Sequence, residues 1–146
     1  MPRVLVLNGP NLGRLGTREP QVYGTATLDD LRAVLEAATS DSLSVDVRQT
    51  DDEATLIGWL HEAVDTACPV ILNAAAFTHY SYALRDAVAI VTEANLILIE
   101  VHLSNPHARE SFRHRSVITA VATGVIAGFG FDSYVLALQL VRTRLA

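Results

Sequence analysis

Apolar residues recur along the chain in two alternating patterns, short continuous runs and longer amphipathic stretches. The continuous runs span residues 4–7, 69–73, 96–102 and 124–128. Such runs are typical of strands buried on both faces of a sheet. A further segment, residues 43–47, alternates apolar and polar side chains and indicates an edge strand. The pattern therefore predicts five strands.

Between these runs the apolar residues follow helical spacing. Thr27, with Asp30 three residues later, is expected to cap a first helix through Ala38. A second helix is expected after Asp51 and Asp52 and should end at Cys68-Pro69, because proline cannot continue a helix. A third helix is expected at about residues 81–92, and a closing helix capped by Asp132 or Ser133 should run through Leu145.

The order of these elements predicts the fold class. Repeated strand and helix units with continuously apolar strands predict a parallel sheet with helices on both faces. We expect an α/β fold, a doubly wound five-stranded parallel sheet, forming a single domain over residues 1–146. The sequence shows no linker, repeat or low-complexity segment.

Half of the residues are hydrophobic and the mean hydropathy is +0.28. The longest uncharged stretch, residues 116–131, is interrupted by glycine and threonine and is shorter than the roughly 20 apolar residues of a membrane span. We therefore expect no membrane segment and assign the apolar surplus to the sheet and to subunit interfaces.

Charge and cysteine content narrow the possible partners. The net charge of −5 gives a nucleic-acid partner no global electrostatic support. The single Cys68 cannot form an internal disulfide, and the first residues lack signal-peptide features, so we expect a reducing, cytoplasmic setting. Residues 103–115 nevertheless carry Arg109, Arg113 and Arg115 against Glu110 alone, which suggests a small anionic ligand.

Polar side chains follow three of the predicted strands where each strand ends. They are Asn8, Asn11, Asn73, Thr78, His79, His102, Ser104 and Asn105. Because parallel strands bring their following loops to one edge, we expect these groups to line one crevice. For Asn8 a turn-forming role at the strand end is an equal alternative. The segment 8–24 is interpreted as a mobile lid that carries Arg18 and Tyr23. Arginine suits a carboxylate and amides suit hydroxyls, so a polyhydroxylated carboxylate is a plausible ligand.

Several of these residues also allow other interpretations, including a metal site and a nucleotide site. The histidines lack the helical spacing of zinc motifs, which argues against a metal site. The glycines of residues 9–16 lack the Lys-Ser/Thr ending of a phosphate-binding loop, which argues against a nucleotide site. His61 is expected on a solvated helix face. Glu100 lies two residues before His102 on a strand, so it either orients the imidazole or forms an ordinary buried charge pair.

Three motifs together resemble a known family. They are residues 9–24 (GPNLGRLGTREPQVYG), residues 73–79 (NAAAFTH) with 83–86 (ALRD), and residues 100–113 (EVHLSNPHARESFR). In order and spacing, and on through residues 124–128, they resemble type II 3-dehydroquinate dehydratase of the shikimate pathway. The resemblance implies a flavodoxin-like fold, a homododecamer built from trimers, and neither cofactor nor metal.

The resemblance also implies residue roles. Tyr23 matches the base, Arg18 the lid arginine that favours its ionised form, and His102 the acid that protonates the departing hydroxyl, with Glu100 as its partner. Asn11 matches the residue that holds a water against the enolate oxygen. The positions that match substrate-binding residues are Asn73, His79, Leu103, Ser104 and Arg113, with Asp86 contributed across a subunit contact. The departures from the family pattern are Ala75, Ala76, Val117 and Ser133.

The residues agree with this chemistry independently. Loss of water from a β-hydroxyketone needs a base, a group that holds the enolate charge and an acid. A Schiff-base route would need a lysine, and all 11 lysine or arginine residues of this chain are arginine. A flavin- or nucleotide-binding module and an inactive assembly protein remain the alternatives. The sequence leaves open whether the pathway is biosynthetic or degradative.

Overall fold

Five parallel strands form the sheet that the apolar runs predict. The computed structural model describes residues 2–39 and 42–145. The strands are β1 (Arg3–Asn8), β2 (Ser44–Gln49), β3 (Val70–Asn73), β4 (Leu98–His102) and β5 (Gly124–Ala127). Their order is β2-β1-β3-β4-β5, with every neighbouring pair parallel. This order is flavodoxin-like, and β2 lies at the predicted edge.

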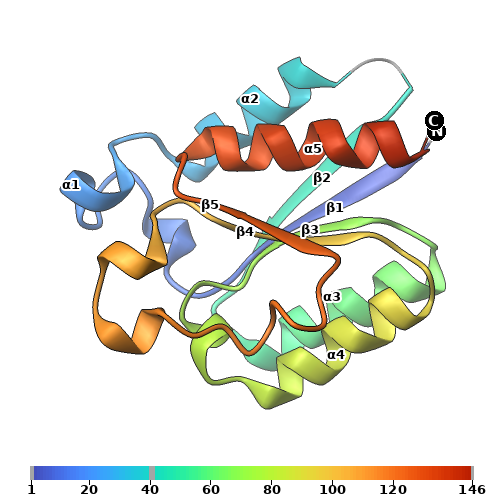
Figure 1. The fold of residues 1–146 in the computed structure, drawn as a ribbon. Coiled ribbons are helices and arrows are strands. Elements are labelled where there is room, and N and C mark those ends of the chain that lie inside the picture. The colour runs from blue at the N-terminus through green and yellow to red at the C-terminus, as the bar shows by residue number, and fades with distance from the viewer. Residues whose placement is uncertain (1, 40–41, 146) are drawn as a thin grey trace.

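Four helices cover the two faces of the sheet (Figure 1). One face carries α2 (Leu28–Ala38) and α5 (Phe131–Leu145), and the other carries α3 (Glu53–Asp65) and α4 (Tyr82–Glu93). Thr27 and Asp30 form the expected reciprocal cap of α2, with each side chain bonded to the other residue's backbone N–H. Asp52 caps α3 and Ser81 caps α4.

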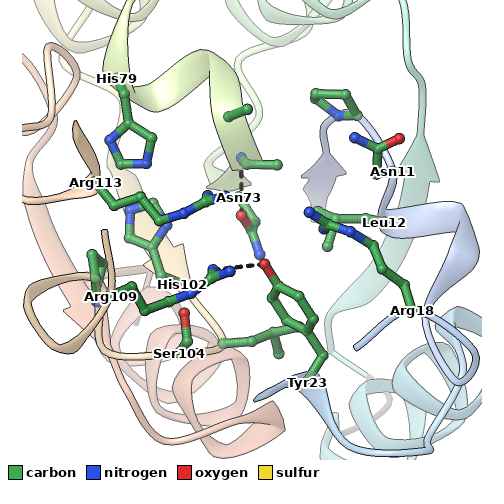
Figure 2. A pocket seen from close by; sticks show the side chains of 15 residues that line it. Asn11, Leu12, Arg18, Tyr23, Asn73, His79, His102, Ser104, Arg109 and Arg113 are labelled. Atoms are coloured by element: carbon green, nitrogen blue, oxygen red, sulfur yellow. Dashed lines mark hydrogen bonds between the residues drawn. The ribbon is translucent and has the colours of Figure 1, made fainter. Parts of the chain in front are cut away.

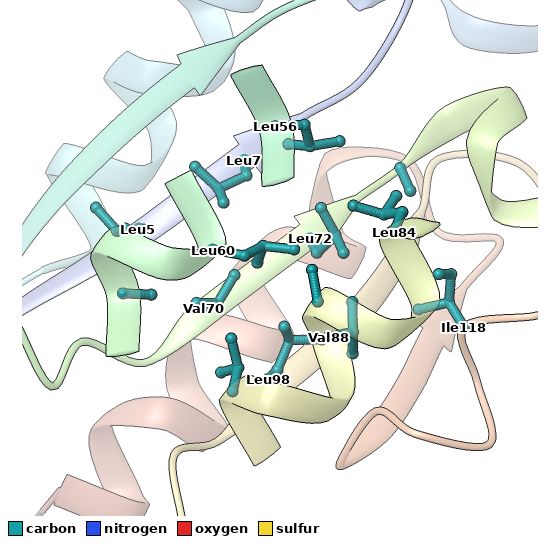
Figure 3. Close-up of a cluster of buried hydrophobic side chains, with 14 of the residues drawn as sticks. Leu5, Leu7, Leu56, Leu60, Val70, Leu72, Leu84, Val88, Leu98 and Ile118 are labelled. Atoms are coloured by element: carbon teal, nitrogen blue, oxygen red, sulfur yellow. The ribbon is translucent and has the colours of Figure 1, made fainter. Parts of the chain in front are cut away.

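Alternate residues of the central strands β1, β3 and β4 enter two separate cores. Leu5 and Leu7 of β1 pack with the apolar faces of α3 and α4 (Figure 3), whereas Val4 and Val6 pack with α2 and α5. All four side chains are fully buried. Because helices cover both faces of these central strands, the strands appear as continuous apolar runs in the sequence.

Two expected helix boundaries need correction. The closing helix begins at Phe131, so Ser133 lies inside it; the Ser133 hydroxyl instead accepts a hydrogen bond from the backbone N–H of Phe129, at 3.1 Å. The second helix ends at Asp65 rather than at Cys68. Proline disfavours helical backbone at the residue before it, so the helix ends early and Ala67 turns the chain with a φ of 54°.

Short helices in the loops were not expected from the sequence. They are η1 (Leu12–Arg14), α1 (Pro20–Tyr23), η2 (Ala75–His79), η3 (Pro106–Ala108) and η4 (Ser111–Arg113). Elements of three to five residues are too short to show a hydrophobic period. Local signals are present at the starts of two of them: Pro20 is the first residue of α1, and Pro106, preceded by the capping residue Asn105, is the first residue of η3.

The loops after β1 and β3 touch at the carboxyl edge of the sheet. The backbone N–H of Gly9 donates to the carbonyl of Asn73 at 2.8 Å, and a Cβ at Gly9 would lie 2.6 Å from the Ala74 carbonyl oxygen. Only glycine permits this approach. Because the chain leaves β1 and β3 toward opposite faces of the sheet, this edge is where such folds open a crevice. No helix in the described ranges is long and apolar enough to cross a membrane.

Candidate active site

A cleft opens at the carboxyl ends of β1, β3 and β4 (Figure 2). Its empty volume is about 500 Å³, open solvent included. Nine of the predicted site residues line it: Asn11, Arg18, Tyr23, Asn73, His79, His102, Leu103, Ser104 and Arg113. Glu100 lies behind His102, and Asp86 lies outside the cleft on the exposed surface of α4.

The lid positions Tyr23 between two arginines. Arg109 Nη1 donates a hydrogen bond of 2.7 Å to the phenolic oxygen of Tyr23, and Arg109 Nη2 donates to Glu19 Oε2 at 3.3 Å. The Arg18 guanidinium lies over the Tyr23 ring, with its carbon 4.9 Å from the ring centre. The expected proximity of Arg18 and Tyr23 is therefore present, but the cation that bonds the phenolic oxygen is Arg109.

The sequence did not predict the position of Arg109 in the cleft. It lies 86 residues from Tyr23 in the sequence, so no local pattern joins the two. The available signal was the excess of arginine in residues 103–115. That signal predicted an anion site without saying which arginine faces the phenol.

The opposite wall of the cleft holds an imidazole and carboxylate pair. His102 Nε2 lies 2.5 Å from Glu100 Oε2, so the expected contact is present. Glu100 is only 1% exposed and also accepts hydrogen bonds from Ser116 Oγ at 3.1 Å and Thr119 Oγ1 at 2.6 Å. Neither hydroxyl was predicted to belong to the site.

These contacts determine the protonation of the pair. Burial raises the pKa of Glu100, but hydrogen bonds from His102, Thr119 and Ser116 together outweigh burial and hold that pKa below its usual value. Glu100 is therefore ionised and can only accept, so the proton lies on His102 Nε2. This leaves His102 Nδ1 as the ring nitrogen that can exchange a proton with a bound molecule.

His79 is held with its acceptor nitrogen available. Its Nδ1 lies 2.8 Å from the backbone carbonyl of Arg115, and a carbonyl only accepts, so Nδ1 carries the proton. Burial lowers the pKa of His79, which favours the neutral ring at pH 7. The remaining nitrogen, Nε2, is then an acceptor suited to a hydroxyl group.

The electrostatics of the cleft favour an anion. Arg18, Arg109 and Arg113 line it, and in the described part of the chain none of its lining residues is acidic. The Arg113 side chain is held by a hydrogen bond from Nε to Glu110 Oε1 at 3.1 Å and by packing over the Phe112 ring. Figure 2 shows the guanidinium of Arg113 directed into the cleft.

Asn8 differs from its expected place at the ligand crevice. It is fully buried beneath the cleft, and its side-chain oxygen accepts a hydrogen bond of 2.6 Å from the Tyr134 hydroxyl. The reason is that an asparagine at the end of a doubly covered strand needs buried partners, and α5 supplies one. Tyr134 also accepts a hydrogen bond from Asn73 Nδ2 at 2.9 Å, a link that no sequence pattern indicated.

Three other expected residues lie elsewhere. Thr78 and Asn105 line a neighbouring hollow on the far side of His102 rather than the cleft itself. Asp86 is exposed and pairs with Arg85 at 3.3 Å. Within residues 2–39 and 42–145, no three side chains of His, Cys, Asp or Glu are grouped to hold a metal ion.

Comparisons with known proteins point to one family. The family described as Dehydroquinase class II matches residues 2–142. The 3-dehydroquinate dehydratase of Salinispora tropica is 57% identical over 143 residues, which cover 97% of this chain and 98% of that protein. The corresponding protein of Mycobacterium tuberculosis is 56% identical over 137 residues, covering 93% and 91% of the two chains.

Solved structures lead to the same family. The crystal structure of the type II dehydroquinase from Propionibacterium acnes matches with a TM-score of 0.92 at 51% identity, covering 98% of this chain and 97% of that one. That from Butyrivibrio crossotus matches with a TM-score of 0.91 at 38% identity, covering 97% of each chain. With a family match across nearly the whole chain, and relatives of more than half identical sequence, this chain belongs to the class II dehydroquinase family.

Proposed function

We propose that this chain eliminates water from 3-dehydroquinate to give 3-dehydroshikimate, with Tyr23 as base and His102 as acid. The reaction is that of the shikimate-pathway dehydratase for which the relatives are named. The observation that carries the proposed mechanism is that one cleft holds both Tyr23, whose hydroxyl bonds Arg109, and His102, whose imidazole bonds Glu100. A base and an acid in one cleft suit an elimination.

The first step forms an enolate. The Tyr23 oxygen, once ionised, takes the proton from the carbon beside the ketone, and the C–H electron pair moves into the enolate. The Arg109 N–H groups stabilise negative charge on that oxygen through a charge-assisted hydrogen bond. Asn11, at the rim of the cleft, holds a water against the developing enolate oxygen.

The second step expels the hydroxyl group. The enolate electrons form the carbon–carbon double bond while the C–O bond breaks, and the leaving oxygen takes a proton from His102 to depart as water. The Glu100 carboxylate balances the positive charge of the protonated imidazole. Because the chain holds no lysine, the reaction cannot proceed through a covalent imine between the substrate ketone and a lysine side chain.

Substrate binding uses both charge and hydroxyl contacts. Arg113 binds the carboxylate through its free N–H groups. The residues proposed for the other substrate oxygens and the ring are Asn73, His79, Leu103 and Ser104. The acceptor nitrogen of His79 is the partner for a substrate hydroxyl.

Assembly completes the proposal. We assign the chain to a dodecamer built from trimers, in which Asp86 reaches a neighbouring subunit's site. The large side chains exposed on α4 and β5 support an interface between copies: Tyr82, Ile90 and Val125. Light scattering should therefore give a large homo-oligomer, and a fully active monomer would contradict this part. A cytoplasmic location, with Cys68 as a free buried thiol, belongs to the same proposal.

One assay tests the reaction. Adding 3-dehydroquinate to the purified enzyme should produce the ultraviolet absorbance of the conjugated product. Borohydride added with the substrate should leave activity intact, because no lysine can form a reducible imine. No absorbance change would overturn the proposed reaction, and a visible colour in the purified protein would instead favour a flavin-binding module.

A further inference from the structure

A chain of hydrogen bonds, buried at its centre, joins the cleft to the edge strand β2. The backbone N–H of Ala75 donates to Asn73 Oδ1 at 3.1 Å, and Asn73 Nδ2 donates to the Tyr134 hydroxyl at 2.9 Å. Tyr134 donates to Asn8 Oδ1 at 2.6 Å, and Asn8 Nδ2 donates to the carbonyl of Arg48 at 3.0 Å. The chain thus connects η2, β3, α5, β1 and β2.

The direction of every bond in this chain follows from its two ends. The carbonyl of Arg48 can only accept, so Asn8 must turn its NH₂ group toward it and its oxygen toward Tyr134. The Tyr134 hydroxyl has one proton and gives it to Asn8, so it can only accept from Asn73. At the other end the N–H of Ala75 can only donate.

Asn73 consequently has a single allowed amide orientation. Its oxygen points to Ala75 and its nitrogen points the opposite way, as Figure 2 shows. A flipped amide would place its oxygen against a Tyr134 hydroxyl whose proton is already used. Tyr134 uses one of the two protons on Asn73 Nδ2, and in the described ranges no protein acceptor takes the second. Since Asn73 lines the cleft, that N–H is available to a ligand oxygen.

We propose that Tyr134, which does not line the cleft, is a positioning residue for substrate binding that sets the orientation of the Asn73 amide. The cleft then always offers an N–H donor at Asn73, which matches an oxygen that only accepts, such as a ketone or carboxylate oxygen. Tyr134 is fully buried, and burial raises the pKa of its phenol, so the hydroxyl keeps the proton on which the orientation depends.

The same series of hydrogen bonds also stabilises the backbone at Ala75, which lines the cleft. Ala75 has a φ of 51°, a left-handed conformation that costs a non-glycine residue about 1–3 kcal/mol. The bond from its N–H to Asn73 Oδ1 favours that conformation over competing ones. This bond helps to hold an alanine in a conformation that usually favours glycine.

The proposal rests on the proposed function and is tested by Tyr134→Phe, which removes only the hydroxyl. We expect KM for 3-dehydroquinate to rise roughly three- to tenfold, the range of one neutral hydrogen bond, with kcat changed less than twofold. The matched control is Ser133→Ala, which removes the neighbouring buried hydroxyl of α5 and the hydrogen bond that it accepts from Phe129. This variant leaves the hydrogen bonds from Ala75 to Arg48 intact, so KM should not change.

A double-mutant cycle separates positioning from general destabilisation. In an Asn73→Ala background, Tyr134→Phe should cause no further rise in KM, because the group it positions is absent. An unchanged KM in folded Tyr134→Phe, or an equal rise in the Asn73→Ala background, would overturn the proposal. If Tyr134→Phe does not fold, Asn8→Ser, which frees the Tyr134 proton, should raise KM in the same way, and an unchanged KM would overturn it.

Calorimetry makes the test independent of turnover. Binding of 3-dehydroquinate to Tyr23→Phe and to Tyr23→Phe with Tyr134→Phe should show the same three- to tenfold difference in Kd. Wild-type enzyme that binds but does not turn over would overturn the proposed function while this comparison still decides the role of Tyr134. Equal Kd values, or no binding at all, would overturn the role of Tyr134.

Discussion

The two walls of the cleft are built in opposite ways. Glu100 and His102 lie on the central strand β4 and are buried. They bond each other, and Glu100 also accepts a hydrogen bond from Thr119, so folding alone brings these groups together. Tyr23 lies on a four-residue helix in a lid whose surface is largely exposed, and within the described residues its hydroxyl is held by Arg109 alone, from another loop. The proposed acid is therefore preorganised by folding, whereas the proposed base depends on contacts between loops.

The comparison predicts that the two groups differ in their tolerance to substitution. A buried carboxylate needs hydrogen bonds to remain ionised, so its environment must be complete before substrate arrives. A phenol on a lid can approach the substrate after binding and can leave with the product. Substitutions on the lid should therefore reduce turnover without affecting stability, and substitutions behind His102 should affect both.

Removing the phenolic hydroxyl should have the largest effect. Tyr23→Phe should lower kcat by about 10²–10⁴-fold, the usual contribution of a general base, while substrate binding and assembly stay intact. The measurement is steady-state kinetics with binding by calorimetry, and Tyr80→Phe, at an exposed tyrosine that does not line the cleft, is the matched control. A variant that keeps more than a few per cent of wild-type kcat would show that the base lies elsewhere.

Local signals explain which parts of the fold could be predicted from sequence. The cap formed by Thr27 and Asp30, the start of α3 after Asp52 and the apolar strands all depend on residues within a few positions of one another. The contact of Glu100 with His102 follows from their spacing on one strand. Such features need no knowledge of how the chain packs.

The features that sequence could not provide join distant segments. The bond from Arg109 to Tyr23 spans 86 positions and that from Tyr134 to Asn8 spans 126. Asn8 was misplaced for the same reason, since its polar character suggested the crevice while its partner on α5 was unknown. The roles of the site residues remain predictions that the kinetic experiments test.

The second-largest effect is expected for the arginine that bonds the phenol. Arg109→Ala should lower kcat about 10- to 150-fold, because a hydrogen bond to a charged oxygen contributes about 1.5–3 kcal/mol. The control is Arg32→Ala, which removes a surface arginine paired with Asp29. A kcat equal to that of wild type would mean that Arg18 alone supports the phenolate.

Arg113 should affect binding rather than turnover. If it holds the substrate carboxylate, Arg113→Ala should raise KM roughly ten- to a hundredfold with a smaller change in kcat, because the contact exists in both ground and transition states. Arg115→Ala, from the same basic loop but outside the cleft lining, is the matched control. An unchanged KM for Arg113→Ala would place the carboxylate elsewhere in the cleft.

The smallest effect concerns the buried wall and its dependence on pH. The pKa of Glu100 is lowered in the folded protein against the opposing effect of burial, partly by the hydrogen bond from Thr119. A carboxylate with a depressed folded pKa contributes stability above its unfolded pKa of about 4.3, and this contribution is lost as pH falls through the folded value. Thr119→Val removes one cause of the depression and should raise that folded pKa.

The acid limb of stability should therefore move to higher pH in Thr119→Val, with about 1–2 kcal/mol less free energy of unfolding at pH 7. Thr119→Ser, which retains the hydroxyl, should stay close to wild type. Denaturant unfolding between pH 3 and 7 measures both. On the lid, Glu19→Gln should change the free energy of unfolding by less than about 1 kcal/mol, because its ion pair with Arg109 is partly exposed. Equal losses from Thr119→Val and Glu19→Gln would contradict the distinction between a preorganised wall and a loosely held lid.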